Sequence, residues 1–487
     1  MNSTVPNARA EQQEIDASAK WPVLVFFSQA IAWLIIGGAL QLIAATQLHT
    51  PNFLGFLSGC EWFTYGRVNA AANFLLAYGW GFNAGLGVAL WLMARLSAAA
   101  LRHGGWLIVA CKAWNITLGL GMLGILMGGT TSFDLLEMPR WITVMMLVCY
   151  AAMGVWAITT FSVRNTDNVF AAQWYIFGAV LWFPWLFAVA QTMLFNLPTH
   201  GVVQAIVGAW YVNGIYGLWF TPLALACAYY FVPKITGRPI NHYYLTGVSF
   251  WWFIVTTAFA GGSRLLGGPV PAWVSTVGTT ANFLLVPALV IIFVNFFRPL
   301  ASGFETAKGS VSFKFIVLSI VAFFFAAGLN LVLANRPLAA EMQFTLIPEL
   351  RDWVIAYACF STAMFGAAYF IIPRLAGRPW HSSALVGIHY WLTLVGIVGI
   401  VVGVGYAGSE QGRMLNTNVP FADITAMLKP WLAFRTVTLM ALLVGHVAFA
   451  INFFWTAFNS VIETGPKAEF ANPPAMAATT ASEGQHA

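Results

Sequence analysis

Charged residues are scarce in this 487-residue sequence. Asp, Glu, Lys and Arg together make up 8% of it, whereas about 25% is usual in a soluble protein. A chain with so few charges, with 60% hydrophobic and 16% aromatic residues, cannot present a surface that water solvates. The composition therefore excludes a water-soluble fold and predicts a protein whose surrounding solvent is lipid.

Paired cysteines and intramembrane carboxylates are also missing. The five cysteines are scattered and form no C-x-x-C-H haem-attachment motif, no zinc spacing and no disulfide framework. All 16 Asp and Glu residues lie near expected helix ends, in loops or in tails, and Glu349 and Asp352 come closest to the membrane interior. Because a carboxylate inside the bilayer is costly and marks a function, the sequence indicates no proton relay and no catalytic residue.

What is present is a series of twelve hydrophobic runs, each long enough to cross a bilayer core of about 30 Å. The runs are continuous rather than alternating, which predicts helices and not a barrel. We therefore predict an all-α polytopic membrane protein with a polar arm at 1–20, one transmembrane domain at 21–461 and a disordered tail at 462–487. The runs cover residues 22–46, 68–96, 106–128, 141–161, 170–195, 203–233, 243–263, 273–297, 312–334, 349–372, 384–407 and 430–458.

Lys and Arg are concentrated in the expected loops on the side of the two termini. This asymmetry predicts that both termini are cytoplasmic, with a bacterial inner membrane as the expected location. The net charge of +6 fits contact with anionic membrane lipid, and nothing suggests nucleic acid. Two cations fall inside hydrophobic runs. Lys112 either pairs across helices or has a function, and Arg435 either extends to the outer headgroups or contacts a ligand or lipid.

A twelve-residue segment occurs twice. AYYFVPKITGRP at 228–239 returns 140 residues later as AYFIIPRLAGRP at 368–379. Each copy ends a helix with an aromatic pair, a proline, a basic residue and a glycine, followed by Arg-Pro. The period spans four of the predicted helices, so the twelve spans divide into three quasi-equivalent four-helix units. Only the second copy is followed by a histidine, His389, where the first has Ser249.

These segments resemble a known family. YYFVPKITGRP at 229–239, YFIIPRLAGRPWHSSALVGIHYWL at 369–392 and YGRVNAAANFLLAYG at 65–79 are similar to the catalytic subunit (subunit I) of haem–copper oxidases. The C-family, cbb-type cytochrome c oxidase is the most similar, and the nitric oxide reductases come second. The resemblance covers about 20–460 and implies the family's twelve helices in a threefold arrangement. It also implies two haems and a copper, held by histidines of the second, sixth, seventh and tenth helices.

The histidines that the resemblance implies are absent. No histidine lies between 243 and 380, and the two membrane histidines, His389 and His446, lie in the eleventh and twelfth helices. Either they are satisfied by hydrogen bonds or they clamp one haem b between them; we expect no copper and predict no cofactor in this chain. The positions that match the family's ligands carry Ala72, Asn213, Ser263, Arg264, Arg351 and Trp353.

Three functions follow from the resemblance. The first is a membrane scaffold without its own haem–copper centre, a non-catalytic subunit of a respiratory complex that holds c-type cytochrome subunits. It predicts small apolar residues, as in NAAAN and AFAGG, where haems would lie. The second is a redox subunit that retains haem through unusual ligands. The third is a small-molecule transporter that uses the vacated cavity, with a polar lining at Asn213, Thr256, Thr257, Ser263 and Arg264.

Overall fold

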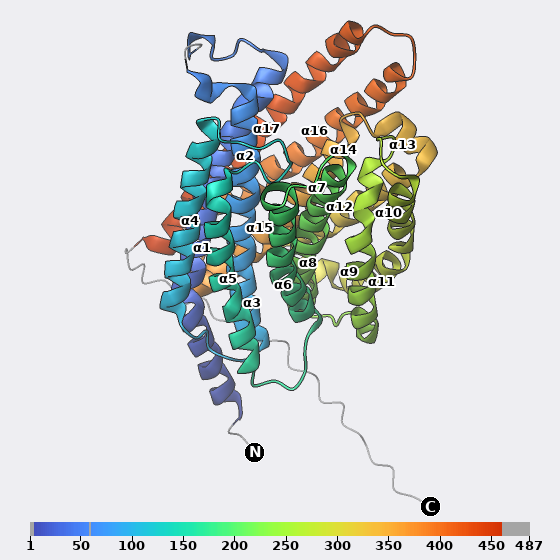
Figure 1. The fold of residues 1–487 in the computed structure, drawn as a ribbon. Coiled ribbons are helices and arrows are strands. Elements are labelled where there is room, and N and C mark those ends of the chain that lie inside the picture. Colours follow the sequence, from blue (N-terminus) through green and yellow to red (C-terminus); the bar gives the residue numbers. More distant parts are fainter. Residues whose placement is uncertain (1–3, 58–59, 460–487) are drawn as a thin grey trace, which may run out of the picture.

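The computed structural model of the chain describes residues 4–57 and 60–459, with side chains from residue 12 onward. Within these residues twelve helices are long and apolar enough to cross a membrane, which confirms the predicted number of spans. Figure 1 shows them packed into one helical bundle. Residues 4–20 of the expected polar arm form the first part of α1 (Thr4–His49), and the expected tail at 462–487 lies outside the described residues.

Half of the twelve spans are single α-helices, and each of the other six is divided into two or more helical segments. The longest are α1, α16 (Ser383–Leu415) and α17 (Phe421–Phe458). The remaining α-helices are α2 (Tyr65–Phe74), α3 (Phe82–Leu96), α4 (Gly104–Leu126), α5 (Arg140–Ser162), α6 (Ala171–Gln191), α7 (Val202–Gly214), α8 (Thr221–Thr236), α9 (Thr246–Phe259), α10 (Ala272–Leu284), α11 (Val286–Ala307), α12 (Val311–Ala334), α13 (Arg336–Met342), α14 (Ile347–Trp353) and α15 (Thr362–Ala376).

Three spans form the centre of the bundle, and each is built from two α-helices: α2 with α3, α7 with α8, and α14 with α15. They are 94%, 83% and 89% buried along their most apolar stretch, against 33–50% for the other nine. A π-helical segment joins the two halves of each: η3 (Leu75–Gly81), η5 (Ile215–Phe220) and η8 (Val354–Ser361). These segments begin 140 and 139 residues apart, which is the period of the sequence repeat. The three predicted units are therefore present in the fold.

The repeated segment ends two of the central spans in the same way. Gly237 ends α8 with φ +66° and Gly377 ends α15 with φ +72°. Their N–H groups donate to the carbonyl oxygens of Pro233 and Pro373 at 3.1 and 2.9 Å. Glycine adopts this left-handed conformation without the penalty of a Cβ atom, so the two copies encode one helix terminus.

Large aromatic rings fill the centre. Trp80, Phe220 and Phe360 occupy equivalent positions of the three central spans, 140 residues apart, and the rings of Phe220 and Phe360 lie 4.8 Å apart. Beside them Phe82 stacks on Trp219 with centroids 3.7 Å apart. Ala70, Ala71 and Ala72 of NAAAN are buried in α2 as well, so the expectation of small fillers where haems would lie stays a prediction. Helices buried on every side need volume to reach close packing, and aromatic rings supply it.

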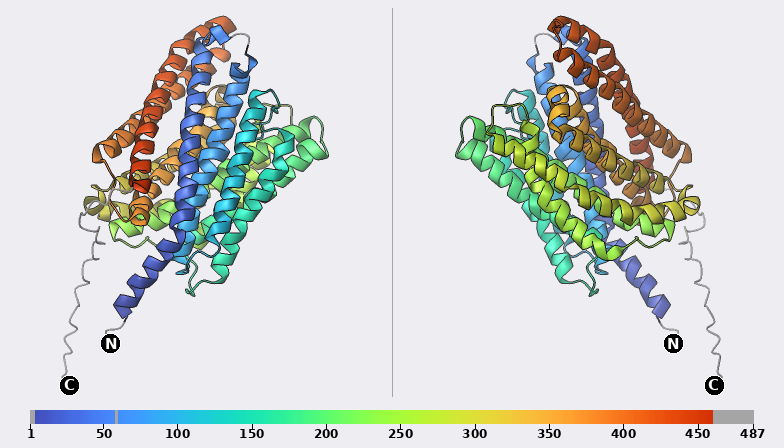
Figure 2. Two further views of the ribbon diagram at one scale, coloured as in Figure 1. Left: turned by 90° about the vertical axis from the view of Figure 1, so that its left-hand side faces the viewer. Right: turned by 90° about the vertical axis from the view of Figure 1, so that its right-hand side faces the viewer.

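The two ends of the bundle differ in shape. Figure 2 shows α16 and α17, in orange and red, extending beyond the neighbouring helices at the end opposite the N-terminus. The loop that follows α1 lies at the same end. The cavity described next opens toward this end, which we call the outer end.

Candidate functional site

A cavity of about 740 Å³ lies among the central spans, α17 and the loop between α4 and α5. Its volume is in the range of small-molecule sites. Apolar side chains form much of its wall, including the three equivalent rings of Trp80, Phe220 and Phe360. The charged residues that line it are widely separated in sequence: Asp134, Glu137, Arg264, Glu349, Arg351, Asp352 and Arg435.

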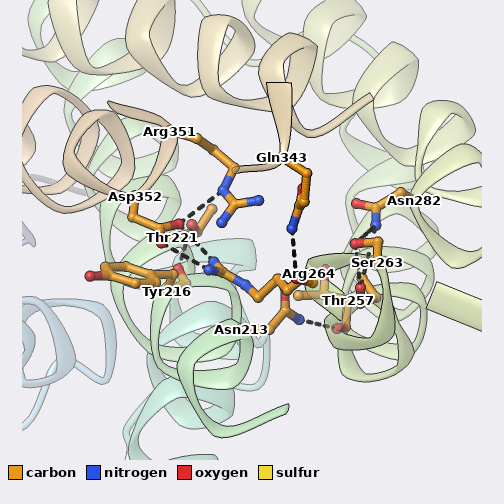
Figure 3. A network of polar contacts seen from close by, with 11 residues as sticks. Asn213, Tyr216, Thr221, Thr257, Ser263, Arg264, Asn282, Gln343, Arg351 and Asp352 are labelled. Carbon is orange, nitrogen blue, oxygen red and sulfur yellow. Dashed lines mark hydrogen bonds and ion pairs between the residues drawn. The ribbon is translucent and has the colours of Figure 1, made fainter. Parts of the chain in front are cut away.

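Arg264, Arg351 and Asp352 form an ion-pair cluster at this cavity (Figure 3). Nη1 and Nη2 of Arg264 donate to Oδ2 and Oδ1 of Asp352 at 2.8 and 2.7 Å. Nε of Arg351 donates to the same Oδ1 at 2.9 Å. Two cations therefore share one carboxylate. The side chain of Arg351 is only 4% exposed, yet the described residues offer its two terminal nitrogens no hydrogen-bond acceptor.

The residues of this cluster come from two segments that are distant in sequence. Arg264 lies in the short helix η7 (Ala260–Leu265) at the outer end of the seventh span. Its backbone carbonyl accepts a hydrogen bond of 2.6 Å from Nε2 of Gln343, and its guanidinium lies over the ring of Tyr216 at 5.6 Å. Arg351 and Asp352 are consecutive residues of α14. Gln343 thus holds the backbone of Arg264, and the Tyr216 ring and Asp352 hold its guanidinium.

A second ion pair lies on the same cavity. Arg435 of α17 donates from Nη2 to Oε1 of Glu349 at 2.5 Å, and its Nη1 is buried without a partner. The Arg435 side chain is 12% exposed and its partner Glu349 is 51% exposed; the expected contact of Arg435 with the outer headgroups, a ligand or lipid stays a prediction. Lys112 differs in both respects, since it is exposed on α4 and forms no ion pair with a described residue.

Two loop carboxylates complete the lining, and the sequence had not pointed to them. Asp134 and Glu137 lie between α4 and α5, outside the membrane-spanning helices. Glu137 is 7% exposed and its Oε2 has no partner. Burial raises the pKa of Glu137 to about 8, and the nearby Asp134 carboxylate adds to the rise. Burial likewise raises the pKa of Asp134. The loop folds back into the bundle, which a loop position in the sequence does not reveal.

The two membrane histidines lie close together, with ring centroids 6.1 Å apart. The hydroxyl of Tyr369 is 2.9 Å from Nδ1 of His389, and the hydroxyl of Tyr357 is 2.5 Å from Nε2 of His446. The remaining ring nitrogens, Nε2 of His389 and Nδ1 of His446, are buried without a partner. The ring of Phe365 packs against both imidazoles, and of the two only His446 lines the cavity.

The other predicted positions divide between packing and the cavity wall. Ala72 is buried in α2, and Trp353 lines the cavity. Nδ2 of Asn213 donates to the backbone carbonyl of Thr257 at 2.8 Å, and the hydroxyl of Ser263 accepts from Asn282 at 2.9 Å. These amide and hydroxyl groups connect neighbouring helices.

The polar patch expected for a transporter is therefore placed differently. Of its five residues only Arg264 lines the cavity. Thr256 is half-buried and its hydroxyl donates to its own helix, to the carbonyl of Trp252 at 2.7 Å. Among the described residues, no group of three or more His, Cys, Asp and Glu side chains could hold a metal ion.

Comparison with known proteins identifies relatives along nearly the whole chain. The model of the family described as cytochrome c and quinol oxidase polypeptide I matches residues 22–443. Cytochrome c oxidase subunit 1 of Rhodobacter capsulatus is 25% identical over 453 residues, which are 87% of this chain and 83% of that protein. The cbb3-type cytochrome c oxidase subunit CcoN1 of Stutzerimonas stutzeri is 24% identical over 403 residues, 80% and 83% of the two chains.

A solved structure shares the fold. A haem-copper terminal oxidase dimer determined by cryo-EM aligns with a TM-score of 0.72 at 12% identity, over 94% of this chain and 85% of the other. At this identity the likeness is one of fold. It places the twelve spans of the bundle in the arrangement of that oxidase chain.

Proposed function

This chain belongs to the cytochrome c and quinol oxidase polypeptide I family, and from that premise we propose that it is a non-catalytic membrane subunit without its own haem–copper centre. In this proposal it is a scaffold of a respiratory or electron-transfer complex in a bacterial inner membrane, with both termini cytoplasmic. It holds a membrane-anchored c-type cytochrome, and that partner carries the redox chemistry.

The observation that supports the proposal most directly is the Arg264–Asp352–Arg351 cluster. Arg264 and Arg351 are at positions where the family resemblance implies imidazole ligands. A guanidinium has only hydrogen-bond donors and stays protonated, so it cannot bind iron or copper. The side chains of Asn213 and Ser263 are weak metal ligands and are already engaged in hydrogen bonds, and Ala72 has no atom that could bind a metal. This donor set does not fit a haem iron or a copper ion.

The alternative of a haem retained through unusual ligands concerns His389 and His446. Both imidazoles already bond to a tyrosine hydroxyl, and the Phe365 ring packs against each. A porphyrin between them would require that ring and its neighbours to leave a packed core. Each imidazole keeps one ring nitrogen buried without a partner, but the packed Phe365 ring, not open space, lies against both, which favours two packed core histidines over a haem clamp.

Exposed aromatic side chains at the outer end support a docking role. Phe56, Phe344 and Phe421 are 83%, 68% and 69% exposed, and they belong to three different connections between spans. Aromatic residues are enriched where proteins contact one another. We propose this end as the surface that holds the cytochrome partner.

Isolation of the tagged chain from its native membrane tests the scaffold proposal. We expect the chain itself to contain no b-type haem and no copper by pyridine haemochrome and metal analysis, and covalently bound haem to be found on a co-purifying polypeptide. A His389→Leu/His446→Leu variant should leave the absorbance spectrum unchanged. A stoichiometric b-type haem that this double variant removes would contradict the proposal and favour the redox alternative.

A second candidate function, a carrier or receptor for a small organic anion, is favoured by the unpaired terminal nitrogens of Arg351. A guanidinium edge suits a carboxylate, which accepts two parallel hydrogen bonds. The apolar walls at Trp80 and Phe360 would accommodate the rest of such a molecule. This second function keeps the idea of a ligand-binding cavity from the transporter hypothesis, but different residues line the cavity.

Equilibrium dialysis of the solubilised chain against benzoate tests this candidate, with the neutral isostere benzamide as comparison. We expect retention of benzoate only, and a loss of about tenfold or more in affinity for Arg351→Gln, as for one lost charged bidentate contact. Arg413→Gln, at an exposed arginine paired with Glu410 outside the cavity, is the control. Ala356→Phe should also block binding because it fills the cavity. Equal retention of benzoate and benzamide would exclude the anion site.

A further inference from the structure

The repeat places three cations at the end of the bundle that carries the N-terminus. Arg95, Lys234 and Arg374 stand in the last turns of the three central spans, 139 and 140 residues apart. Arg95 is neutralised by Asp16 of α1, whose Oδ1 is 3.4 Å from its Nε. Lys234 and Arg374 form no ion pair with any described residue. Of the three equivalent cations only Arg95 therefore has a direct ion pair among the described residues; Asp16 acts on Arg374 from a greater distance.

Lys234 and Arg374, the two cations without a direct ion pair, line a separate cavity of about 440 Å³. Ser310, Ser312 and Trp380 also line it, with the Ser312 hydroxyl and the Trp380 indole N–H bonded to the backbone carbonyls of Gly366 and Tyr369. No carboxylate of the described residues lines it. Phe370, Val386 and Ile235 form an apolar side. The outer cavity is lined by both cations and carboxylates, whereas the described residues that line this one carry only positive charge.

The side chain of Arg374 is held in a fixed orientation. Its Nη1 donates to the carbonyl of Phe370 at 2.5 Å, and its guanidinium lies 3.3 Å above the ring of the same residue. Nε and Nη2 have no acceptor among the described residues. A cation whose orientation is set in advance, with unpaired donors at a cavity, is suited to an oxyanion because less entropy is lost on binding.

The beginning of α12 adds further donors. Ser310 is its N-cap and accepts from the N–H of Phe313 at 3.4 Å, so that position is satisfied. The N–H groups of Val311 and Ser312 precede the first intrahelical bond and are left without one. The first turn contains no acidic residue, so the positive end of the helix dipole is unopposed there. Helix starts of this kind bind phosphate.

We propose that this cavity binds a phosphate group, and that the phosphodiester of an anionic phospholipid is its occupant. Lys234, Arg374 and the start of α12 contact the phosphate, and the apolar side at Phe370 and Val386 contacts the upper part of an acyl chain. The cavity lies where the central spans end, at the level of the headgroups, and basic pockets between helices at that level bind anionic headgroups. This inference is independent of the scaffold proposal and of the outer cavity.

Native mass spectrometry of the full-length chain tests it, after reconstitution with equal amounts of phosphatidylglycerol and phosphatidylcholine. We expect one phosphatidylglycerol to remain bound preferentially, and the Lys234→Gln/Arg374→Gln variant to lose about tenfold or more of this preference because two charge-assisted contacts are removed. Lys308→Gln is the matched control, since this lysine is exposed near the start of α12, is paired with Glu305 and does not line the cavity.

Two further arms keep the proposal falsifiable. Val311→Trp fills the cavity and keeps both cations, so it should also lose the lipid. It tests the site independently in case the double variant does not fold. Thermal stabilisation by inorganic phosphate without selective retention of phosphatidylglycerol would overturn the lipid assignment and support a site for free phosphate. Equal retention of the two lipids, or a double variant that binds like the Lys308→Gln control, would overturn the site itself.

Discussion

At the scale of single residues, the unusual feature of this chain is where its few charges are placed. Arg351 is 4% exposed, although arginine is almost never fully buried unless paired. It is tolerated because Asp352 lies beside it and also neutralises Arg264. Removing the carboxylate of such a cluster leaves buried cations without compensation, which costs far more than an exposed pair contributes. The charges at the outer cavity therefore depend on one another.

Glu137 makes the stability of the protein sensitive to pH. Its pKa is about 8 in the folded chain and 4.5 ordinarily, so the folded state binds this proton more tightly than the unfolded state does. Its contribution is most favourable below about pH 4.5 and is lost as the pH rises through 8. We expect the free energy of unfolding to fall over this interval by an amount on the order of a few kcal/mol, and the unfolding temperature to fall with it.

The Glu137→Gln variant should remove most of this dependence, because the amide cannot ionise. At pH 9 it should unfold at a higher temperature than the wild type, and at pH 5 the two should differ little. Thermal unfolding in detergent across this pH range is the measurement, with Glu341→Gln at an exposed glutamate as control. A variant that follows the wild-type pH profile would show that Glu137 is ionised at neutral pH.

At the scale of helices, the repeat is expressed as local backbone geometry. The π-helical segments recur at the same place in each central span, and such segments are often found at functional sites. Here two of them, η5 and η8, bring Phe220 and Phe360 into contact at the wall of the outer cavity. The repeat thus places equivalent aromatic rings at the outer cavity, and equivalent cations at the opposite end of the same three spans.

Two pairs of equivalent glycines should respond in opposite directions to alanine. Gly237 and Gly377 have positive φ, so each Gly→Ala change should cost about 1 kcal/mol through backbone strain. Gly247 and Gly387 lie within α9 and α16 with space around them, and alanine there should stabilise by up to about 1 kcal/mol through helix propensity. Unfolding temperatures of the four single variants test this. Opposite shifts within either pair would contradict the structural equivalence of the repeats.

At the scale of the whole molecule, an oxidase fold is combined with a centre that is packed by side chains. The resemblance to the haem–copper oxidase family is confirmed by the family match over residues 22–443, and the twelve-helix architecture by the structural alignment. The Phe82–Trp219 stack and the three equivalent rings fill the middle of the bundle. Among the described residues, a cavity of mixed charge lies at the outer end and a cationic cavity at the other.

The sequence by itself determined the membrane class, the twelve spans, the threefold repeat and the lack of imidazoles at the family's ligand positions. These features depend on composition and on spacing along the chain, which can be read locally. Only the tertiary structure decided which charges meet. Arg264 and Asp352 are 88 residues apart in sequence, and Glu349 and Arg435 are 86 apart, while Glu137 enters the cavity from a loop. Such contacts arise from the packing of distant helices, and no local pattern encodes them.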